Sequence, residues 1–169
     1  MKLQYRPMTE SEYERDIKGS LEDYIKDISV YEEEFQKQMQ KSPREFAEQQ
    51  FNDSLPSGVN SPDNYFWIMI DTETNEEVGF LWFTVIPDRN LCLLSYIKVL
   101  EDRRGKGYGT EMLHYLEFYV AKNHPKIDKL YLHVFKHNPR AKKLYETQGF
   151  KIFYESFEGD NLIKEIKRD

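Results

Sequence analysis

Cysteine is almost absent from this chain of 169 residues, which holds only Cys92. A single thiol excludes an intramolecular disulfide, so the fold must depend on its core. No uninterrupted apolar run approaches the roughly 20 residues that a membrane-spanning helix needs. The first residues, MKLQYRPMTESEYERD, also lack the apolar segment of a secretion signal. From these absences we expect a cytoplasmic protein that is not inserted in a membrane.

Aromatic residues, in contrast, are plentiful: the chain has 12 Tyr and 11 Phe, and 39% of its residues are hydrophobic. Disordered chains rarely have this composition, so we expect a folded protein although 32% of the residues are charged. A chain of this length can bury a substantial core within one domain. The sequence therefore predicts a single domain over residues 1–169.

Positive charge is scarce in most of the chain and concentrated in one segment. The net charge is −6, but residues 98–143 hold 11 Lys and Arg against 5 Asp and Glu, whereas residues 1–97 hold 9 against 19. An acidic protein with one basic segment is not typical of a general nucleic-acid binder. The segment indicates either a small anionic ligand or a solvated charged surface.

Apolar spacing, capping residues and turn formers predict strands alternating with helices. We expect strands at 3–8, 65–71, 78–86, 91–100, 129–135, 150–157 and 162–167, with the sequence EGDN (158–161) as the turn between the last two. We expect helices from Thr9 toward Ile28, then at 30–51, 107–123 and 138–149. This order predicts a mixed α/β fold, in which helices cover both faces of one sheet.

The segment RRGKGYGTEML (103–113) lies between a predicted strand and a predicted helix. Its glycines let backbone N–H groups approach a ligand closely, and the helix N-terminus adds partial positive charge. Arg103, Arg104 and Lys106 add formal charge. The Walker and dinucleotide-binding spacings do not fit. The segment therefore predicts a pyrophosphate site of another kind, or simply a tight turn.

The spacing Arg104-x-x-Gly107-x-Gly109 follows the strand residues YIKVL and precedes the sequence NPRAKKLYETQGF (138–150). Together the two motifs resemble the Gcn5-related N-acetyltransferase (GNAT) family, most strongly over residues 78–154. The resemblance implies a mostly antiparallel sheet of about seven strands with about four helices, and acetyl-CoA as cosubstrate. Residues 55–67 and LHVFKHN (132–138) resemble uncharacterised members from bacilli, which leaves the acceptor open.

The resemblance also implies roles for individual residues in binding the cosubstrate. The pyrophosphate would be held by Arg104 and by backbone N–H groups of Gly105, Lys106, Gly107, Tyr108, Gly109 and Thr110. The backbone from Ile97 to Val99 would pair with the pantetheine arm, in a cleft that a strand bulge opens in this family. Asn138 would contact the same arm. Arg140 or Lys143 would meet the 3′-phosphate, unless each is a solvated helix charge.

For the chemistry, the resemblance implies that Tyr145 protonates the departing thiolate. A phenol with a pKa near 10 is protonated at neutral pH, as a general acid must be. The alternative for a tyrosine on a helix is ordinary packing. A backbone N–H of the segment 97–99 would donate to the carbonyl oxygen as it becomes an oxyanion.

The general base is where the sequence departs from the family. One family position for a catalytic glutamate falls on Leu93, which cannot act as a base, and another falls on His133. A histidine with a pKa near 6.5 can accept a proton at physiological pH. In an alternating strand Tyr131, His133 and Phe135 share one face. The alternatives are a structural histidine, or a water chain ordered by Tyr96 or Ser95.

Several other residues have weaker signals. Cys92 on an apolar strand is expected in the core. His114, His124 and His137 show no metal-ligand spacing, so no metal is expected. The first helices carry aromatic and acidic side chains that would suit a cationic acceptor, although a solvated face with core aromatics is favoured; these residues are Tyr24, Tyr31, Glu32, Glu33, Glu34 and Phe35.

The sequence thus predicts an acetyl-CoA-dependent N-acetyltransferase that acts by direct transfer in a ternary complex. The acceptor would be a primary amine, on a small molecule or on a peptide. The alternative is a non-catalytic module that binds acyl-CoA as a sensor. Neither nucleic acid nor membrane is an expected partner. A homodimer remains open, since the closing strands are able to pair between subunits.

Overall fold

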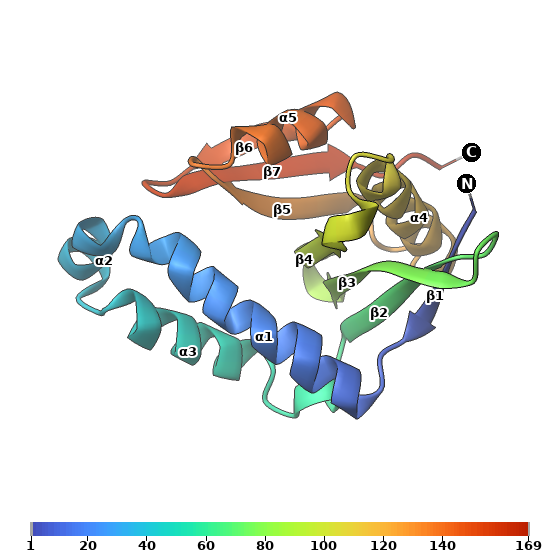
Figure 1. Cartoon of the computed structure of the whole chain (residues 1–169). Coiled ribbons are helices and arrows are strands. Elements are labelled where there is room, and N and C mark those ends of the chain that lie inside the picture. The colour runs from blue at the N-terminus through green and yellow to red at the C-terminus, as the bar shows by residue number, and fades with distance from the viewer. Residues whose placement is uncertain (1, 169) are drawn as a thin grey trace.

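The computed structural model describes residues 2–168 and contains one seven-stranded sheet in the order β1-β2-β3-β4-β5-β7-β6 (Figure 1). The strands are β1 (Leu3–Pro7), β2 (Asn64–Asp71), β3 (Glu76–Ile86), β4 (Leu91–Val99), β5 (Lys129–Phe135), β6 (Lys151–Glu155) and β7 (Gly159–Glu165). Every neighbouring pair is antiparallel except β4 and β5. The prediction of a mostly antiparallel sheet of about seven strands is confirmed.

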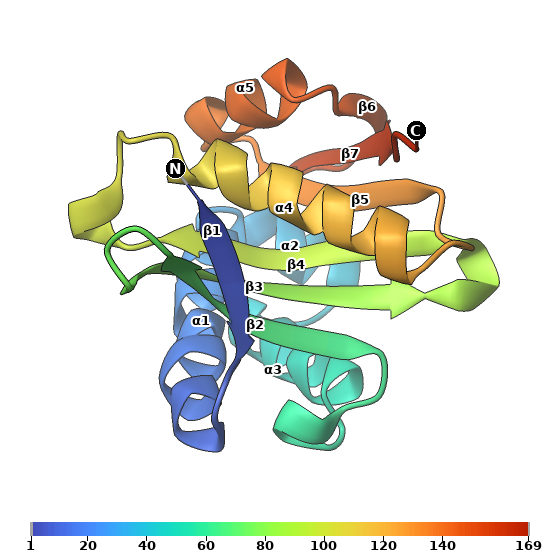
Figure 2. The same cartoon turned by 90° about the vertical axis from the view of Figure 1, so that its right-hand side faces the viewer.

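Helices cover both faces of this sheet, as predicted. They are α1 (Glu10–Ser29), α2 (Glu32–Met39), α3 (Pro43–Ser54), α4 (Tyr108–Asn123) and α5 (Pro139–Thr147). Figure 2 shows α4 crossing one face while α1, α2 and α3 lie behind the opposite face. α5 lies next to β5, β6 and β7. Residues 2–168 thus contain five α-helices, one more than expected, and no helix long and apolar enough to cross a membrane.

The additional helix arises because the predicted helix at 30–51 is wrong: α2 and α3 are separate. The chain leaves α2 at Gln40, which adopts the left-handed conformation with φ of 56°. Ser42 then caps α3 by accepting from the backbone N–H of Glu45 at 3.2 Å, and Pro43 occupies the first turn. Proline lacks an N–H and disrupts a helix interior, whereas it is favourable at a helix start.

The predicted EGDN turn (158–161) is also wrong, because β7 begins at Gly159. The chain reverses through residues 156–158 instead. Asp160 and Asn161 are turn formers by propensity, but both are buried in the strand. Asp160 pairs with Lys142 at 2.8 Å, and Asn161 accepts a hydrogen bond from the Tyr131 hydroxyl at 2.7 Å. These tertiary contacts outweigh local turn propensity.

The start of α1 matches its sequence signature closely. The Thr9 hydroxyl accepts from the backbone N–H of Glu12 at 3.1 Å, and the Glu12 carboxylate accepts from the Thr9 N–H at 2.9 Å. Arg6 of β1 also donates to the Glu12 carboxylate at 2.7 Å. The predicted capping box is confirmed. The contact between Arg6 and Glu12 ties the first helix to the edge strand.

Two apolar layers pack against the sheet. The larger core lies under α4 and contains Trp67 and the fully buried Cys92. A second core lies under α1 and α3 and contains Trp82, which is 8% exposed. The expectation that Cys92 belongs to the core is confirmed.

Candidate active site

The glycine-rich turn leads into α4 in a conformation that favours glycine. Gly105 has φ of 76° and Gly107 has φ of 86°, and Gly107 is the N-cap residue of α4. A Cβ at either position would meet no atom within 4 Å. Left-handed backbone geometry, rather than lack of space, therefore explains these two glycines.

The turn presents a row of unpaired backbone donors. Within residues 2–168, no backbone or side-chain group accepts a hydrogen bond from the N–H groups of residues 105–110. The helix N-terminus adds partial positive charge at the same place. Unpaired N–H groups at a helix start bind phosphate groups. The geometry therefore fits the pyrophosphate role predicted for residues 105–110.

The cationic and aromatic side chains of this turn have different surroundings. Arg103 pairs with Glu76 on β3, so its charge is already compensated. The Tyr108 hydroxyl donates to the buried Asp71 at 2.7 Å, which anchors the start of α4. Arg104 is exposed, and its Nε donates to the Val99 carbonyl at 3.3 Å. Lys106 is exposed as well.

Strands β4 and β5 diverge next to this turn, and we call the place where they separate the fork. β4 pairs with β5 only through residues 91–93 and 129–131. Just beyond, the β3–β4 register shifts because Trp82 opposes Tyr96 while Phe83 opposes Leu94, which leaves Ser95 as a bulge residue. A bulge bends its strand away from regular pairing. The expected bulge and the divergence of these strands are both present.

Past the fork, part of the β4 backbone faces the open side. The Leu100 N–H donates to the Val78 carbonyl at 2.9 Å. Peptide groups alternate in direction along an antiparallel ladder. Those of Ile97 and Val99 therefore point away from β3, toward the gap between β4 and β5. This is the arrangement needed for pairing with an extended amide-containing arm.

Asn138 and Lys143 belong to the second motif. The Asn138 side chain caps α5, because its Oδ1 accepts from the Ala141 N–H at 3.2 Å, and its amide nitrogen stays available. Lys143 lies on the exposed side of α5. Within residues 2–168 nothing pairs with Lys143. Neither position identifies what the side chain binds, so both binding roles stay predictions.

A cavity of about 740 Å³ extends from the fork to the α1–α3 layer. Its walls come from α1, α2, α3, β3, β4, β5 and α5, and from the β6–β7 hairpin. Nine aromatic side chains line it, namely Tyr24, Phe35, Phe46, Phe51, Trp82, Tyr96, Tyr131, Phe135 and Tyr145. The charged residues in the wall are the acidic Asp27 and Glu158, and no Lys or Arg among residues 2–168 lines it. Aromatic faces and carboxylates together favour a cation.

Tyr145 reaches this cavity from α5. Its ring packs against Phe150 at 5.9 Å between centroids. No group within residues 2–168 hydrogen-bonds its hydroxyl, which is thus available to a ligand. Burial raises the pKa of Tyr145 to about 12. The phenol therefore carries its proton throughout the physiological range, as the predicted general acid requires.

His133 lines the same cavity from β5, together with Tyr131 and Phe135. These three residues alternate with the buried Leu132 and Val134, so they do share one face. Burial lowers the pKa of His133, although the nearby Glu158 carboxylate opposes this effect. The ring is therefore largely neutral at pH 7 and able to accept a proton. His133 Nε2 lies 3.2 Å from Glu158 Oε1.

The third candidate for proton removal is water ordered by Tyr96 or Ser95. Both of these residues line the cavity. The Tyr96 hydroxyl donates to Asp23 at 3.4 Å. Burial, reinforced by the charge of Asp23, raises the pKa of Tyr96 to about 12. Tyr96 is thus a hydrogen-bonding group rather than a proton acceptor. Leu93 lines the cavity as an apolar side chain.

The acidic wall suggested by the first helices is formed by other residues. Glu32, Glu33 and Glu34 are exposed and do not line the cavity. The idea that they form part of its wall is therefore wrong, and the favoured alternative, a solvated helix face, is confirmed. They lie in the first turn of α2, where the helix dipole favours anions. The cavity acids are instead Asp27 and Glu158, and sequence reasoning missed both.

One end of the cavity is fastened by contacts to His137. Its Nδ1 lies 2.8 Å from the Tyr31 hydroxyl, and its Nε2 lies 3.0 Å from Asp27 Oδ1. The Tyr31 oxygen also accepts from the His137 backbone N–H at 3.2 Å. We name this group of Asp27, Tyr31 and His137 the α1 clamp. It holds the end of α1 against the loop between β5 and α5.

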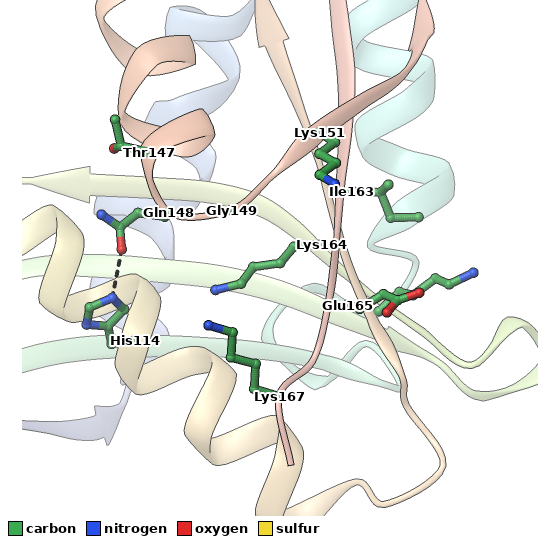
Figure 3. Close-up of a pocket in the computed structure, with 10 residues that line it drawn as sticks. His114, Thr147, Gln148, Gly149, Lys151, Ile163, Lys164, Glu165 and Lys167 are labelled. Atoms are coloured by element: carbon green, nitrogen blue, oxygen red, sulfur yellow. Dashed lines mark hydrogen bonds between the residues drawn. The ribbon is translucent and has the colours of Figure 1, made fainter. Parts of the chain in front are cut away.

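A second hollow, of about 680 Å³, lies between α4, α5 and the β6–β7 hairpin (Figure 3). It holds His114, which contacts Gln148 at 2.7 Å, and the side chains of Lys164 and Lys167. Lys164 pairs with Glu117 at 2.6 Å. Neither Tyr145 nor His133 lines this hollow, so it lies apart from the candidate chemistry.

Known proteins resemble this chain in both sequence and fold. A family model described as "Acetyltransferase (GNAT) family" matches residues 26–150. The uncharacterised N-acetyltransferase YycN of Bacillus subtilis is 37% identical over 109 residues, which cover 62% of this chain and 67% of YycN. The crystal structure of YycN superposes with a TM-score of 0.78 and 27% identity, over 93% of this chain and 97% of that one.

A more distant structure shares the fold. Spermidine N-acetyltransferase from Vibrio cholerae, solved in complex with CoA and spermine, gives a TM-score of 0.66 at 16% identity. The match covers 97% of this chain and 95% of that one. At this identity the likeness shows a common architecture, and the acceptor has to be argued from the cavity itself.

Proposed function

This chain belongs to the GNAT acetyltransferase family, and we propose that it transfers an acetyl group directly to a primary amine while acetyl-CoA and the amine are both bound. The protein is an N-acetyltransferase, and acetyl-CoA is its acyl donor. The proposal concerns the acceptor and the route of transfer. The observation that carries it is the cavity charge: Asp27 and Glu158 line it, and no Lys or Arg does.

The donor side of the site fits acetyl-CoA. The unpaired N–H groups of residues 105–110 suit a pyrophosphate, and Arg104 adds charge beside them. The N–H groups of Ile97 and Val99 and the Ile97 carbonyl face the fork, where they can pair with the amides of the pantetheine arm; the Val99 carbonyl accepts from Arg104. When bound, acetyl-CoA supplies a thioester carbonyl as electrophile and a thiolate as leaving group. The N–H groups of residues 97 and 99 are the proposed donors to the carbonyl oxygen.

On the acceptor side, an alkyl amine has a pKa near 10.4 and enters mostly as an ammonium ion. The carboxylates and aromatic faces of the cavity attract this cation. His133 then accepts the proton that the nitrogen must lose before it can act as a nucleophile. In the overall transfer the nitrogen bonds to the acetyl carbon and the C–S bond breaks. The proton of the Tyr145 hydroxyl goes to the sulfur, and the second proton that the nitrogen loses as it becomes an amide restores that hydroxyl. His133 returns its proton to solvent.

The test measures release of free CoA with two primary amines of equal chain length, a linear diamine and the corresponding ω-amino acid. We expect the diamine to have a kcat/KM at least about 10-fold higher, a difference of roughly 1.4 kcal/mol, because a carboxylate would face Asp27 or Glu158. Equal turnover of both amines would contradict the selection of a cationic acceptor by Asp27 and Glu158. Tight acetyl-CoA binding without turnover of any amine would favour a sensor that does not catalyse transfer.

A further inference from the structure

His133 and Glu158 form a half-buried pair at the wall of the acceptor cavity. We infer that Glu158 is a positioning residue, which fixes the tautomer of His133 and stabilises the imidazolium ion that forms when His133 accepts a proton. This inference rests on the proposed role of His133 as the base. It adds a residue that no sequence motif indicated.

The first argument is that the pair contains unsatisfied polar atoms. His133 Nε2 and Glu158 Oε2 are both enclosed, and neither has a hydrogen-bond partner within residues 2–168. Nε2 lies 3.2 Å from Glu158 Oε1, but the angles fall outside hydrogen-bond range. Leaving a buried polar group unpaired is unfavourable. Such groups in a native structure are often functional, and catalytic hydrogen bonds can be poorly aligned until substrate binds.

The second argument concerns which nitrogen faces the cavity. Because Nε2 is enclosed and Glu158 supplies the carboxylate within reach, the favoured neutral tautomer carries its proton on Nε2. Nδ1 is not enclosed in this way, and no group within residues 2–168 hydrogen-bonds it. Its lone pair is thus left for a proton from the acceptor. A carboxylate that orients a catalytic imidazole in this manner is the arrangement of the Ser-His-Asp triad.

The backbone is built to accommodate the pair. Gly159 follows Glu158 and lies opposite Phe135 in the β5–β7 ladder. A Cβ on Gly159 would come within 2.8 Å of His133 Nε2 and 2.3 Å of the Val134 carbonyl. Glycine at this position therefore leaves space for the ring. The Glu158 backbone carbonyl also accepts from the Lys136 N–H at 2.9 Å. This hydrogen bond fixes the backbone of Glu158 against the end of β5.

The charges around the ring make Glu158 the dominant partner. The second carboxylate that acts on His133 is Asp160, and Lys142 compensates it at 2.8 Å. Tyr24 on α1 and Tyr131 on β5 are close enough to sense the charge of Glu158, and burial raises the pKa of both, so both are neutral. Glu158 is therefore the uncompensated charge beside His133.

The direct test is NMR of the resting protein, which does not depend on turnover. The chain has four histidines, so protein labelled with 15N-histidine gives few signals, and His133→Asn assigns the one of interest. We expect the Nε2-protonated tautomer for His133 in the wild type. In Glu158→Gln we expect a lower pKa for the ring, because the carboxylate that favoured its charged form is gone.

The second test is the pH profile of kcat/KM. Activity requires the neutral ring, so the acidic limb follows the His133 pKa and should move to lower pH in Glu158→Gln. The same variant should lose about 10- to 100-fold in kcat, as is typical when the outer partner of a functional histidine is removed. Glu158→Asp keeps the charge and should keep the limb near its wild-type position. The exposed Glu155 on the same hairpin gives the control Glu155→Gln, which should change neither quantity.

The outcomes separate the two proposals. An unchanged His133 tautomer and pKa in Glu158→Gln, with an unmoved acidic limb, would overturn the inference while the N-acetyltransferase assignment stands. Absence of turnover with every amine would instead defeat the proposed acceptor, and the NMR result would still decide the role of Glu158. If Glu158→Gln does not fold, as judged by circular dichroism, Glu158→Asp decides the matter through kcat. This variant keeps the charge but withdraws the carboxylate from the ring, so an unchanged kcat counts against positioning.

Discussion

The Tyr31 hydroxyl lies 2.8 Å from His137 Nδ1, and this contact joins the turn between α1 and α2 to the loop that precedes α5. The two residues are 106 positions apart in the chain. α1 helps to wall the acceptor cavity, and α5 carries Tyr145. The α1 clamp therefore connects the surface that would receive the acceptor with the element that would supply the proton.

Removing this contact should loosen the acceptor wall. Tyr31→Phe eliminates the two hydrogen bonds between this hydroxyl and His137, each worth about 1 kcal/mol, and should lower Tm by about 4–8 °C. We also expect a rise of roughly 5-fold in the KM for the amine, with little change in the affinity for acetyl-CoA. Initial rates and thermal melts measure both effects.

The matched control for the clamp is His114→Ala, which removes the 2.7 Å contact to Gln148 in the hollow of Figure 3. It should cost similar stability and leave the KM for the amine unchanged. If both variants alter that KM equally, the clamp has no specific link to acceptor binding.

Replacing Tyr145 by phenylalanine should slow transfer with little effect on folding. Its hydroxyl has no hydrogen-bond partner within residues 2–168, so removing it leaves no protein group unsatisfied. General acid catalysis contributes about 10²–10⁴-fold, and we expect a loss of kcat in that range with Kd for acetyl-CoA unchanged. Tyr154→Phe, at a position 60% exposed on β6, is the control.

The pH dependence of the wild type gives a separate check on Tyr145. An acid must be protonated to act, and Tyr145 stays protonated below its pKa of about 12. No loss of kcat from this group should therefore occur on the alkaline side up to about pH 10. A Tyr145-dependent alkaline limb near neutral pH, absent in Tyr145→Phe, would show that its pKa is not raised.

Gly107→Ala should weaken acetyl-CoA binding by disturbing the turn. Its φ of 86° is unfavourable for alanine, so we expect a loss of about 1–2 kcal/mol in the free energy of unfolding, together with a higher Kd for acetyl-CoA. Gly19 in the middle of α1 is the opposite case, because a Cβ there meets no atom within 4 Å and the backbone is helical. Gly19→Ala should stabilise the protein by about 0.5–1 kcal/mol. Urea unfolding and cosubstrate titration compare the two.

Cys92 should be inert in the native protein. It is fully buried, and burial raises the pKa of its thiol to about 12, so almost no thiolate is present at pH 8. A chromogenic disulfide reagent should therefore detect one thiol per chain in urea and essentially none without it. Rapid reaction of the native protein would mean that β4 opens frequently in solution.

Local sequence signals were sufficient for most of the fold. The Thr9 capping box, the left-handed glycines before α4 and the Asn138–Pro139 start of α5 each depend on neighbouring residues, and each is found in the structure. The break between α2 and α3 also had a local signal in Ser42 and Pro43, which the prediction of one long helix overlooked.

The acceptor side of the site could not be predicted in the same way. Glu158 lies next to His133 only because β7 pairs with β5, and its sequence neighbours had indicated a turn. Asp27 faces the cavity from a helix whose surface carries many other acids. A run of glutamates, 32–34, was the more visible signal although it faces solvent. Tertiary packing of strands and helices, not residue type, selects the carboxylates that line the cavity.

The fork between β4 and β5 divides the sheet into two panels, β1-β2-β3-β4 and β5-β7-β6. Three residue pairs join the two panels at one end. Beyond these three pairs, the two panels share no strand pairing within residues 2–168. A small rotation about the three pairs would therefore change the distance between β4 and β5 while each panel stays intact. A pantetheine arm bonded to the β4 edge and held by α5 would brace one panel against the other. Loading of the donor would then set the dimensions of the acceptor cavity, which favours an order of binding in which acetyl-CoA comes first.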